Sequence, residues 1–343
     1  MSTADIPQAT VDALARSVSG RVIGRGDEDH AAAAMPWNMH EQRPALVVEA
    51  TSAEDVARTV AFAAAEGLRV VAQPTGHSST GAFEDAVLIR TGALASVELA
   101  GDGAVARAGA GALWRDVQAA AVPAGRSGLV GTAPHVSATG YTLGGGIGWL
   151  GSPYGVGASR LMAAEVVDAE GRMRRVDAET EPDVLWALRG GGGNYGIVTA
   201  VELGLVEAAE VFAGVLAFPL PRVPEILPAW REWVAGVPRE LTSMATILRV
   251  PDMPTVPEPL RGAQLIVIGA CHAGALADGE AAVAPLRALG PIMDTFGPMA
   301  PDALGTLHHA PEDPLPDIGG ASVLGDVTPE TLGRIIDLAG PEP

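Results

Sequence analysis

The chain contains 343 residues, of which 48% are apolar and 18% are charged. A chain of this length and composition can bury a substantial core, so bulk disorder is excluded and one large domain or two of medium size are expected. The net charge of −19 repels polyphosphate, which argues against nucleic acid and against an anionic membrane as partners.

All 22 basic residues are arginines, and this excludes reactions that need a lysine. A phosphate-binding loop that ends in Gly-Lys-Ser/Thr, a kinase strand lysine and a Schiff-base lysine are all missing. The single cysteine, Cys271, follows an apolar run and is expected to be a buried, inert thiol. The chain shows no basic-then-apolar leader and no apolar run of about 18 residues, so we expect a soluble, cytoplasmic protein.

The first part of the chain alternates helical and extended patterns. Apolar spacing predicts a helix over 11–18 and strands over 45–49, 69–73 and 86–90. Ser52 and Asp55 resemble a capping box, which opens a helix that ends near Gly67. The dipeptide at 102–103, Asp-Gly, predicts a hairpin between two further strands.

The next part is rich in glycine. The patterns predict a short helix over 112–122, no single regular element over 125–151, a hairpin of strands 161–168 and 172–177, a helix over 182–189 and a strand over 196–206. Beyond residue 207 prolines become frequent, and the legible elements are a helix over 224–235, a strand over 264–270 and a helix over 278–289. We therefore expect two domains, 1–206 and 207–343, the second of the α+β class.

Three glycine-rich segments are candidate sites. The loop 73–81 follows a strand, and its backbone N–H groups could form a nest for phosphate oxygens, with the imidazole of His77 as a nucleophile, base or covalent anchor. Segments 139–149 and 189–198 contain further glycines that would allow a flat or charged ligand to approach the backbone. Taken singly, a structural turn or loop is the favoured interpretation of the first and third segments, and for the second it is as good an interpretation as a binding site.

A metal site is the weaker alternative. His308 and His309 lie close to Glu312 and Asp313, but no second group of ligands has a recognisable spacing. A solvated loop is the favoured interpretation of this segment, and no metal is expected.

The three segments together, in this order and separation, resemble the FAD-linked oxidases of the vanillyl-alcohol-oxidase fold, in particular the bacterial branch of the berberine-bridge-enzyme-like group. The resemblance is strongest over 43–206 and continues through the motifs at 257–262, 284–291 and 294–296. It implies an α+β fold in which a two-subdomain FAD-binding domain of the PCMH type, 1–206, precedes an incomplete α+β substrate domain, 207–343.

The resemblance also assigns residues to the cofactor. His77 takes the position of the family's covalent histidine, bonded to the 8α-methyl group of the flavin, and Tyr141 takes a position from which a side chain can tune the flavin. The implied FAD-binding residues are Thr75, Gly76, His77, Ser78, Ser79, Thr80 and Gly81 in the first segment, Thr132, Val136, Gly140, Tyr141, Thr142, Gly144, Gly145, Gly146 and Trp149 in the second, and Asn194, Gly196, Ile197 and Val198 in the third.

Three departures from the family pattern qualify this assignment. Ala133 stands where many relatives carry a second anchoring cysteine, so a single covalent link through His77 is expected. The loop reads Pro-Thr-Gly-His-Ser rather than the commoner Ser-Gly-Gly-His-Ser, a change expected to be harmless because backbone donors bind the phosphates. Members of the family continue beyond the point that matches 340–343, and that part carries further flavin contacts and often the catalytic tyrosine. The catalytic base therefore has no assignment in this chain.

The resemblance implies an FAD-dependent oxidoreductase that moves hydride from a C–H bond of an alcohol, a sugar or a secondary metabolite to flavin N5, with dioxygen as the acceptor that yields hydrogen peroxide. Two alternatives stay open: a flavin-binding remnant without activity, and a dehydrogenase that uses another acceptor. The sequence indicates neither the substrate nor the oligomeric state.

Overall fold

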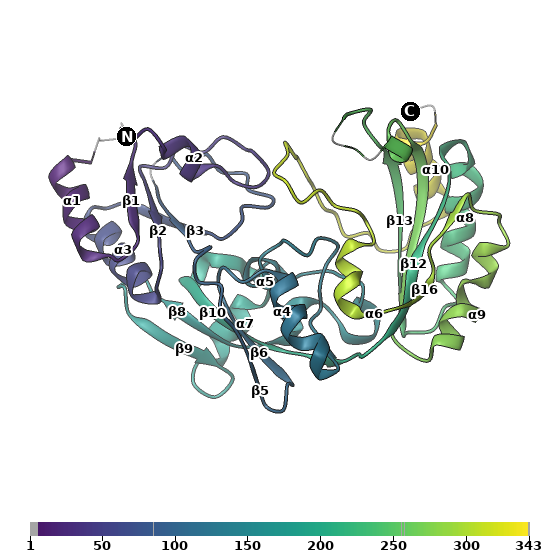
Figure 1. Ribbon diagram of the computed structural model, residues 1–343, viewed down its shortest axis with the longest axis horizontal. Coiled ribbons are helices and arrows are strands. Elements are labelled where there is room, and N and C mark those ends of the chain that lie inside the picture. Colours follow the sequence, from purple (N-terminus) through teal and green to yellow (C-terminus); the bar gives the residue numbers. More distant parts are fainter. Residues whose placement is uncertain (1–5, 85, 255, 257, 342–343) are drawn as a thin grey trace. The chain divides into compact units, whose positions relative to one another are not determined.

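The fold was analysed in a computed structural model that describes residues 6–341 except 85, 255 and 257 (Figure 1). The predicted domain ends at 1 and 343 and the first residue of the 257–262 motif lie outside the described residues. The chain divides into two compact units. The first comprises Met1–Gly148, Val156–Glu207 and His308–Gly320, and the second comprises Trp149–Gly155, Ala208–Leu307 and Ala321–Pro343.

The first unit begins with a small sheet of order β1-β2-β4-β3, formed by β1 (Arg21–Gly24), β2 (Leu46–Glu49), β3 (Arg69–Gln73) and β4 (Ala86–Arg90). Strands β2, β4 and β3 are parallel and β1 is antiparallel to β2. Leu46 and Val48 share a core with α1 (Gln8–Ser17) and α3 (Ala53–Ala65), whereas Val47 packs against α2 (His30–Ala34) on the other face. Since both faces are covered, the strands are continuous apolar runs.

Helix α3 starts where the sequence indicates. The Ser52 hydroxyl accepts a hydrogen bond from the Asp55 N–H over 3.1 Å. The Asp55 carboxylate accepts the backbone N–H groups of Ser19, Gly20 and Thr51 as well as the Thr51 hydroxyl. Burial alone would raise the pKa of Asp55, but these donors lower it below its ordinary value. Asp55 therefore links the start of α3 to the chain segment before β1.

The second part of this unit is an antiparallel sheet of order β5-β6-β10-β8-β9. Its strands are β5 (Val97–Ala100), β6 (Val105–Gly109), β8 (Leu161–Val167), β9 (Met173–Asp177) and β10 (Ile197–Gly204), and a small pair joins β7 (Arg126–Ser127) to β11 (Val206–Glu207). Helices α4 (Trp114–Ala121), α5 (Ala138–Leu143) and α7 (Pro182–Gly191) contact this sheet. The predicted hairpins at 102–103 and 169–171 are confirmed.

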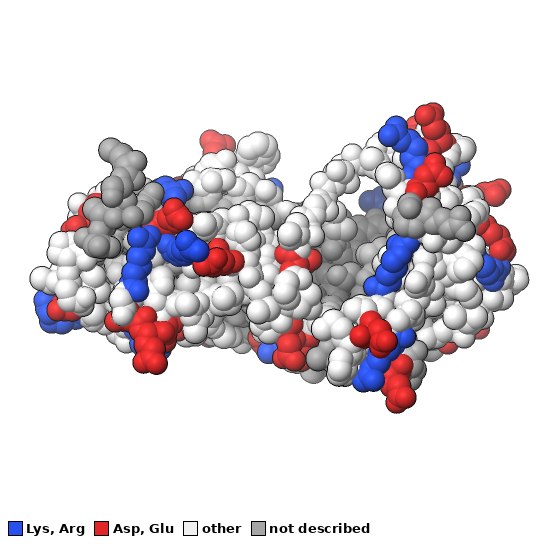
Figure 2. All heavy atoms as spheres, turned by 90° about the horizontal axis from the view of Figure 1, so that it is seen from above, with Lys and Arg blue, Asp and Glu red and all other residues white. Residues whose placement is uncertain are grey.

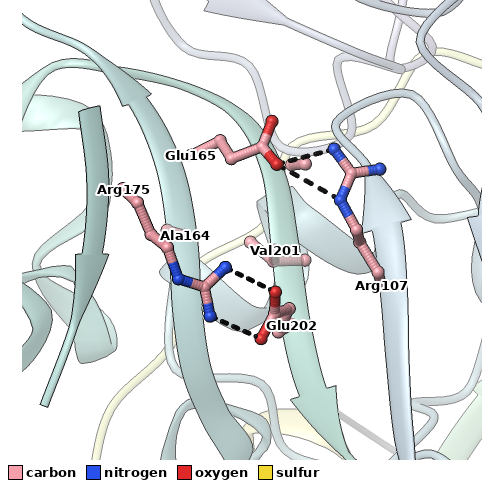
Figure 3. A pocket seen from close by; sticks show the side chains of 7 residues that line it. Arg107, Ala164, Glu165, Arg175, Val201 and Glu202 are labelled. Atoms are coloured by element: carbon pink, nitrogen blue, oxygen red, sulfur yellow. Dashed lines mark hydrogen bonds and ion pairs between the residues drawn. The ribbon is translucent and has the colours of Figure 1, made fainter. Parts of the chain in front are cut away.

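Charged side chains form ion pairs between neighbouring strands on one face of this sheet (Figure 3). Arg107 on β6 reaches Glu165 on β8 over 2.7 Å. Arg175 on β9 makes two hydrogen bonds of 2.6 and 2.9 Å to Glu202 on β10. The shallow hollow between these pairs is therefore filled by ion pairs that hold four strands together, and it lies apart from the glycine-rich segments.

The second unit is a sheet of order β13-β14-β12-β15, with β16 also paired to β12. Its strands are β12 (Val211–Pro219), β13 (Leu241–Arg249), β14 (Gln264–His272), β15 (Met293–Asp294) and β16 (Gly297–Met299). Helices α8 (Val223–Val234), α9 (Leu276–Arg287) and α10 (Pro329–Ala339) pack on one side (Figure 1), where Ile226, Val283 and Leu332 join the core. The short helix α6 (Gly151–Tyr154) contacts β13.

The structure confirms the expected α+β class and shows elements that the sequence analysis did not name. Strand β12 is the clearest of these: all of its residues except Pro219 are buried, so it lacks the alternation that marks a half-exposed strand. Cys271 is 1% exposed, and burial raises its pKa to about 12, which confirms the buried thiol. None of the helices in the described residues is long and apolar enough to cross a membrane. On the face shown in Figure 2, acidic side chains lie beside arginines in separate groups.

Candidate functional site

Amide side chains donate hydrogen bonds to the loop that follows β3, residues 74–81. Ser79 is the centre of this arrangement: its hydroxyl accepts hydrogen bonds from Gln73, over 3.1 Å, and from Gln42, and its carbonyl accepts one from Asn38 over 2.8 Å. Arg90, at the end of β4, donates in turn to the Gln73 side chain. These hydrogen bonds from neighbouring side chains therefore fix the shape of the loop.

The loop backbone visits the left-handed region twice. Gly76 has a φ of +81° and Ser78 a φ of +56°, with His77 between them. A Cβ at Gly76 would lie 2.5 Å from the Cβ of Pro36, so glycine is required here for both conformation and space. Turns that contain left-handed residues can direct successive backbone N–H groups to one side and so form anion-binding nests, and this loop is therefore a candidate for holding phosphate oxygens.

Three side chains surround His77. The indole of Trp37 stacks on its imidazole, with centroids 4.1 Å apart and an interplanar angle of 15°. The imidazole of His135 lies 4.9 Å away. The Thr75 hydroxyl is 3.0 Å from His77 Nδ1. The plane of the His77 ring is thus set by Trp37 and its rotation by Thr75.

The surroundings of His77 keep it neutral. Burial first, and then the neighbouring His135, lower the pKa of His77 to about 4. Burial also lowers the pKa of His135; Glu312 opposes this shift and Arg115 adds to it. At neutral pH the His77 imidazole is therefore uncharged and carries a nitrogen lone pair, which is the nucleophilic form.

A segment from far along the chain lies over these rings. The Trp37 indole N–H donates to the backbone carbonyl of Glu312 over 3.1 Å, and the Asp317 N–H donates to the Asn38 carbonyl over 3.3 Å. Both acceptor and donor belong to the stretch His308–Gly320 of the first unit. This stretch, which the sequence suggests is a solvated loop, thus packs beside the site. Within the described residues no group of three or more His, Cys, Asp or Glu side chains could hold a metal ion.

The second segment reaches the loop through α5. The Ser137 hydroxyl caps this helix, accepting from the Gly140 N–H over 3.3 Å and donating to the Ala110 carbonyl over 3.0 Å. A Cβ at Gly140 would come within 3.8 Å of the Pro74 ring, so helix and loop are neighbours. The ring of Tyr141 lies edge-on to Trp114, with centroids 5.4 Å apart. Burial raises the pKa of Tyr141 far above its ordinary value.

The third segment meets the same helix. It consists of η3 (Gly192–Tyr195) and the start of β10, and both η3 and α7 contact α5. Gly196 has a φ of +125°, and a Cβ there would lie 2.6 Å from the Val167 carbonyl. Asn194 is exposed and donates to the Gly191 carbonyl over 3.0 Å. Val198 is buried in the register of β8.

The three segments thus meet around α5, except for Trp149 at the end of the second segment. Trp149 is fully buried in the second unit, where its ring lies 2.6 Å from the position that a Cβ on Gly269 would take. The remaining predicted residues belong to the first unit, namely Thr75, Gly76, His77, Ser78, Ser79, Thr80, Gly81, Thr132, Val136, Gly140, Tyr141, Thr142, Gly144, Gly145, Gly146, Asn194, Gly196, Ile197 and Val198.

Several buried polar atoms in and beside the first two segments have no hydrogen-bond partner within the described residues, as do a few elsewhere, such as those of Thr91 and His272. Within the described residues, no hydrogen bond reaches His77 Nε2, either ring nitrogen of His135, or the hydroxyls of Thr139, Tyr141 and Thr142. An unpaired buried polar group costs about 1–3 kcal/mol, so such a concentration indicates that a bound group completes it. A cofactor with a diphosphate and a polar ring system fits these donors and the nest, so the residues present are compatible with FAD.

Sequence reasoning missed two residues of this site. His135 lies between Thr132 and Val136, which were assigned, yet no motif marked it. Trp37 precedes His77 by 40 positions, and only the fold brings the two rings together. A further hollow, of about 440 Å³, lies at the ends of β2, β3 and β4 and is lined by Arg21, Glu49 and Arg90 among others.

Comparisons with known proteins agree with this geometry. Residues 44–177 match the family model described as FAD binding domain. (R)-6-hydroxynicotine oxidase of Paenarthrobacter nicotinovorans is 30% identical over 283 residues, which are 80% of this chain and 59% of that protein. FAD-dependent monooxygenase FUP4 of Fusarium proliferatum is 31% identical over 204 residues, which are 58% of this chain and 39% of that protein. The chain therefore spans less than two thirds of the length of either relative.

Solved structures show the same fold. The crystal structure of 6-hydroxy-D-nicotine oxidase from Arthrobacter nicotinovorans superposes with a TM-score of 0.76 at 27% identity, covering 87% of this chain and 66% of that one. A BBE-like protein of Physcomitrella patens gives a TM-score of 0.72 at 22% identity, covering 84% and 62%, and shows likeness of fold alone. These findings confirm the resemblance to FAD-linked oxidases in fold and in the FAD-binding domain.

Proposed function

We propose that this chain, which contains an FAD-binding domain and has the fold of the FAD-linked oxidases, is an FAD-dependent oxidoreductase acting on a small molecule. The observation that carries the proposal is the set of unpaired buried atoms on His77, His135, Tyr141 and two threonines of α5, which lie in and beside the first two glycine-rich segments. Bound FAD would supply the redox chemistry, taking hydride from a substrate C–H bond and passing the electrons to dioxygen.

The residues of the first segment would hold the cofactor without any lysine. Backbone N–H groups around Gly76 and Ser78 would bind the diphosphate oxygens, helped by the exposed hydroxyl of Thr80. The Ser79 hydroxyl instead receives two side-chain amides, so its first role is to hold the loop. Gly140, Gly144 and the third segment would let the cofactor approach the backbone closely.

A single covalent bond through His77 is part of the proposal. The imidazole is neutral, enclosed by Trp37 and His135 and anchored by Thr75, so it is presented in one orientation. Ala133 offers no thiol at the position of a second anchor, and Cys271 is buried in the second unit. Tyr141 is proposed to tune the flavin through its unpaired hydroxyl.

The substrate class and the electron acceptor are proposed from the family resemblance. The proposed substrates are alcohols, sugars or secondary metabolites, and the proposed acceptor is dioxygen. The name of one relative, a 6-hydroxynicotine oxidase, supports oxidation of a small molecule. The cytoplasmic location stays a prediction of the sequence.

The test is direct. The purified protein is examined by visible spectroscopy and then precipitated with acid. Flavin absorbance that stays in the pellet is expected for the natural chain, and flavin that moves to the supernatant is expected for His77→Ala. Hydrogen peroxide release is then measured against a panel of alcohols, sugars and cyclic amines.

Three outcomes would contradict the proposal at different levels. A protein that contains no flavin and cannot be reconstituted with FAD would refute the function itself. Flavin that acid releases from the natural chain would refute only the covalent bond. Turnover with a redox dye but without peroxide would replace dioxygen by another acceptor.

A further inference from the structure

The last residues of β3 and β4 carry polar side chains that lie next to each other. Gln73 and Arg90 are partners in the parallel register of these strands, so their side chains leave the same face of the sheet. Arg90 donates from Nη1 to the side-chain oxygen of Gln73. The strand register therefore places a guanidinium beside the residue from which the loop 74–81 begins.

This contact decides which way the Gln73 amide faces. A guanidinium has five N–H donors and no acceptor, so only the oxygen of the amide can face Arg90. The amide nitrogen is thereby directed at the loop, where it donates to the Ser79 hydroxyl over 3.1 Å. Without the guanidinium, the amide could turn over and present its oxygen to Ser79 instead.

A second amide on the same hydroxyl is not oriented in this way. Gln42 also donates to the Ser79 hydroxyl, but its own oxygen is buried and accepts no hydrogen bond within the described residues. No neighbour therefore dictates which end of the Gln42 amide faces Ser79. The contact from Gln73 is the one whose direction is fixed, and Arg90 fixes it.

Arg90 is not part of an ion pair that would explain its place. Glu49, on the neighbouring strand β2, pairs with Arg21 over 3.4 Å, and within the described residues no salt bridge reaches Arg90. Burial lowers the pKa of Arg90, and the charge of Glu49 opposes this shift. Because a half-buried charge without a counter-ion is costly, the hydrogen bond to Gln73 is the contact that compensates it locally.

We propose that Arg90 is a positioning residue for the phosphate-binding loop and acts through Gln73 and Ser79. The inference rests on the FAD binding proposed above and adds a residue that lies outside the three glycine-rich segments. Ser79 is held at two points, its carbonyl by Asn38 and its hydroxyl by Gln73. The backbone N–H groups of 76–80, which would bind the diphosphate, are thus held in place before the cofactor arrives.

The test compares FAD with riboflavin, which has the same ring system but no phosphate. The flavin-free protein carries His77→Ala so that binding stays reversible, and affinity is measured by flavin fluorescence. In Arg90→Gln the new amide can present either end to Gln73. We expect FAD to bind about 2-fold to about 12-fold more weakly, the loss that one hydrogen bond represents, and riboflavin to bind as before. Arg90→Lys, whose ammonium also only donates, should recover FAD affinity.

Two controls separate positioning from general damage. Arg21 lies at the same edge of the sheet and lines the same hollow as Arg90, but it is paired with Asp29 and Glu49 rather than with the loop. Arg21→Gln should therefore leave FAD affinity unchanged. In a Ser79→Ala background, Arg90→Gln should have no further effect on FAD affinity, because the path from Arg90 to the loop is already broken.

Hydrogen exchange gives a readout that needs no flavin. In the flavin-free protein, the backbone amides of 75–80 should exchange faster in Arg90→Gln than in the natural chain, whereas those of α3 should exchange as before. Faster exchange in both places would mean that the substitution destabilises the whole unit. This measurement also decides the role of Arg90 where riboflavin binds too weakly to be measured.

The outcomes separate this inference from the proposed function. A natural chain that binds neither flavin would refute the function and this inference with it. If the natural chain binds FAD, an Arg90→Gln variant that binds FAD equally well, or that loses FAD and riboflavin to the same extent, would overturn the role of Arg90 and leave the function standing. Unchanged exchange in 75–80, or an undiminished effect in the Ser79→Ala background, would overturn it as well.

Discussion

A substitution of Gly76 by alanine tests whether the site loop is fixed by its surroundings. The residue is buried and has a φ of +81°. Its missing Cβ would lie 2.5 Å and 2.8 Å from the Cβ and Cα of Pro36 and 2.9 Å from Cδ of Gln73. Two of these three atoms belong to the ring and backbone of Pro36, so they cannot move aside as the tip of a flexible side chain could.

The cost has two parts that a matched control separates. An alanine in the left-handed region costs about 1–2 kcal/mol, partly offset by about 0.4–1 kcal/mol from the restricted unfolded chain. Forcing a methyl group into filled space costs about 1–3 kcal/mol more. Gly67, just after α3, has a φ of +67° and no atom within 4 Å of its missing Cβ. Gly67→Ala therefore carries the first cost only.

The assay is urea unfolding of both variants and the natural protein, together with the FAD content of each. We expect Gly67→Ala to lower the free energy of unfolding by at most about 1.6 kcal/mol and to bind FAD normally. We expect Gly76→Ala to lose about 1–3 kcal/mol beyond that and to lose FAD as well, because the loop must shift. Equal losses in the two variants would refute the reasoning, since they would mean that Pro36 does not restrict the loop.

Three further predictions concern buried polar groups. Folding lowers the pKa of His77 from 6.5 to about 4, so between these pH values the unfolded chain binds more protons than the folded one. The free energy of unfolding of the flavin-free protein should therefore fall as the pH drops from about 6.5 to about 4. Urea unfolding across this range should show a smaller fall in His77→Gln. Asp55→Asn should lose about 1.5–3 kcal/mol in the same assay, because several donors converge on the carboxylate. Tyr141→Phe removes an unpaired buried hydroxyl, so urea unfolding should show the flavin-free protein about 1–3 kcal/mol more stable, and redox titration of the loaded protein should show a changed flavin reduction potential.

Much of the fold could be predicted from local patterns in the sequence. The capping pattern at Ser52 and Asp55, the Asp-Gly turn at 102–103 and the apolar runs of β3 and β4 each depend on neighbours a few residues apart. The same holds for the first segment, where the glycine beside His77 is by itself enough to indicate a left-handed turn. The sequence analysis named neither β12 nor β13. In β12 the apolar run is interrupted by Gly214 and ends on Pro219, two residue types that weaken a strand signal.

The sequence by itself determined that this chain has three glycine-rich segments, no lysine to bind phosphate and a histidine placed for a covalent bond. Only the tertiary structure decided what surrounds that histidine. Trp37 and His135 lie 40 and 58 positions from His77 in the chain, yet their rings pack around it, and Trp149 of the second segment proved to be part of the other unit. The physical reason is that ring stacking and desolvation depend on contacts between distant segments, which no local pattern encodes.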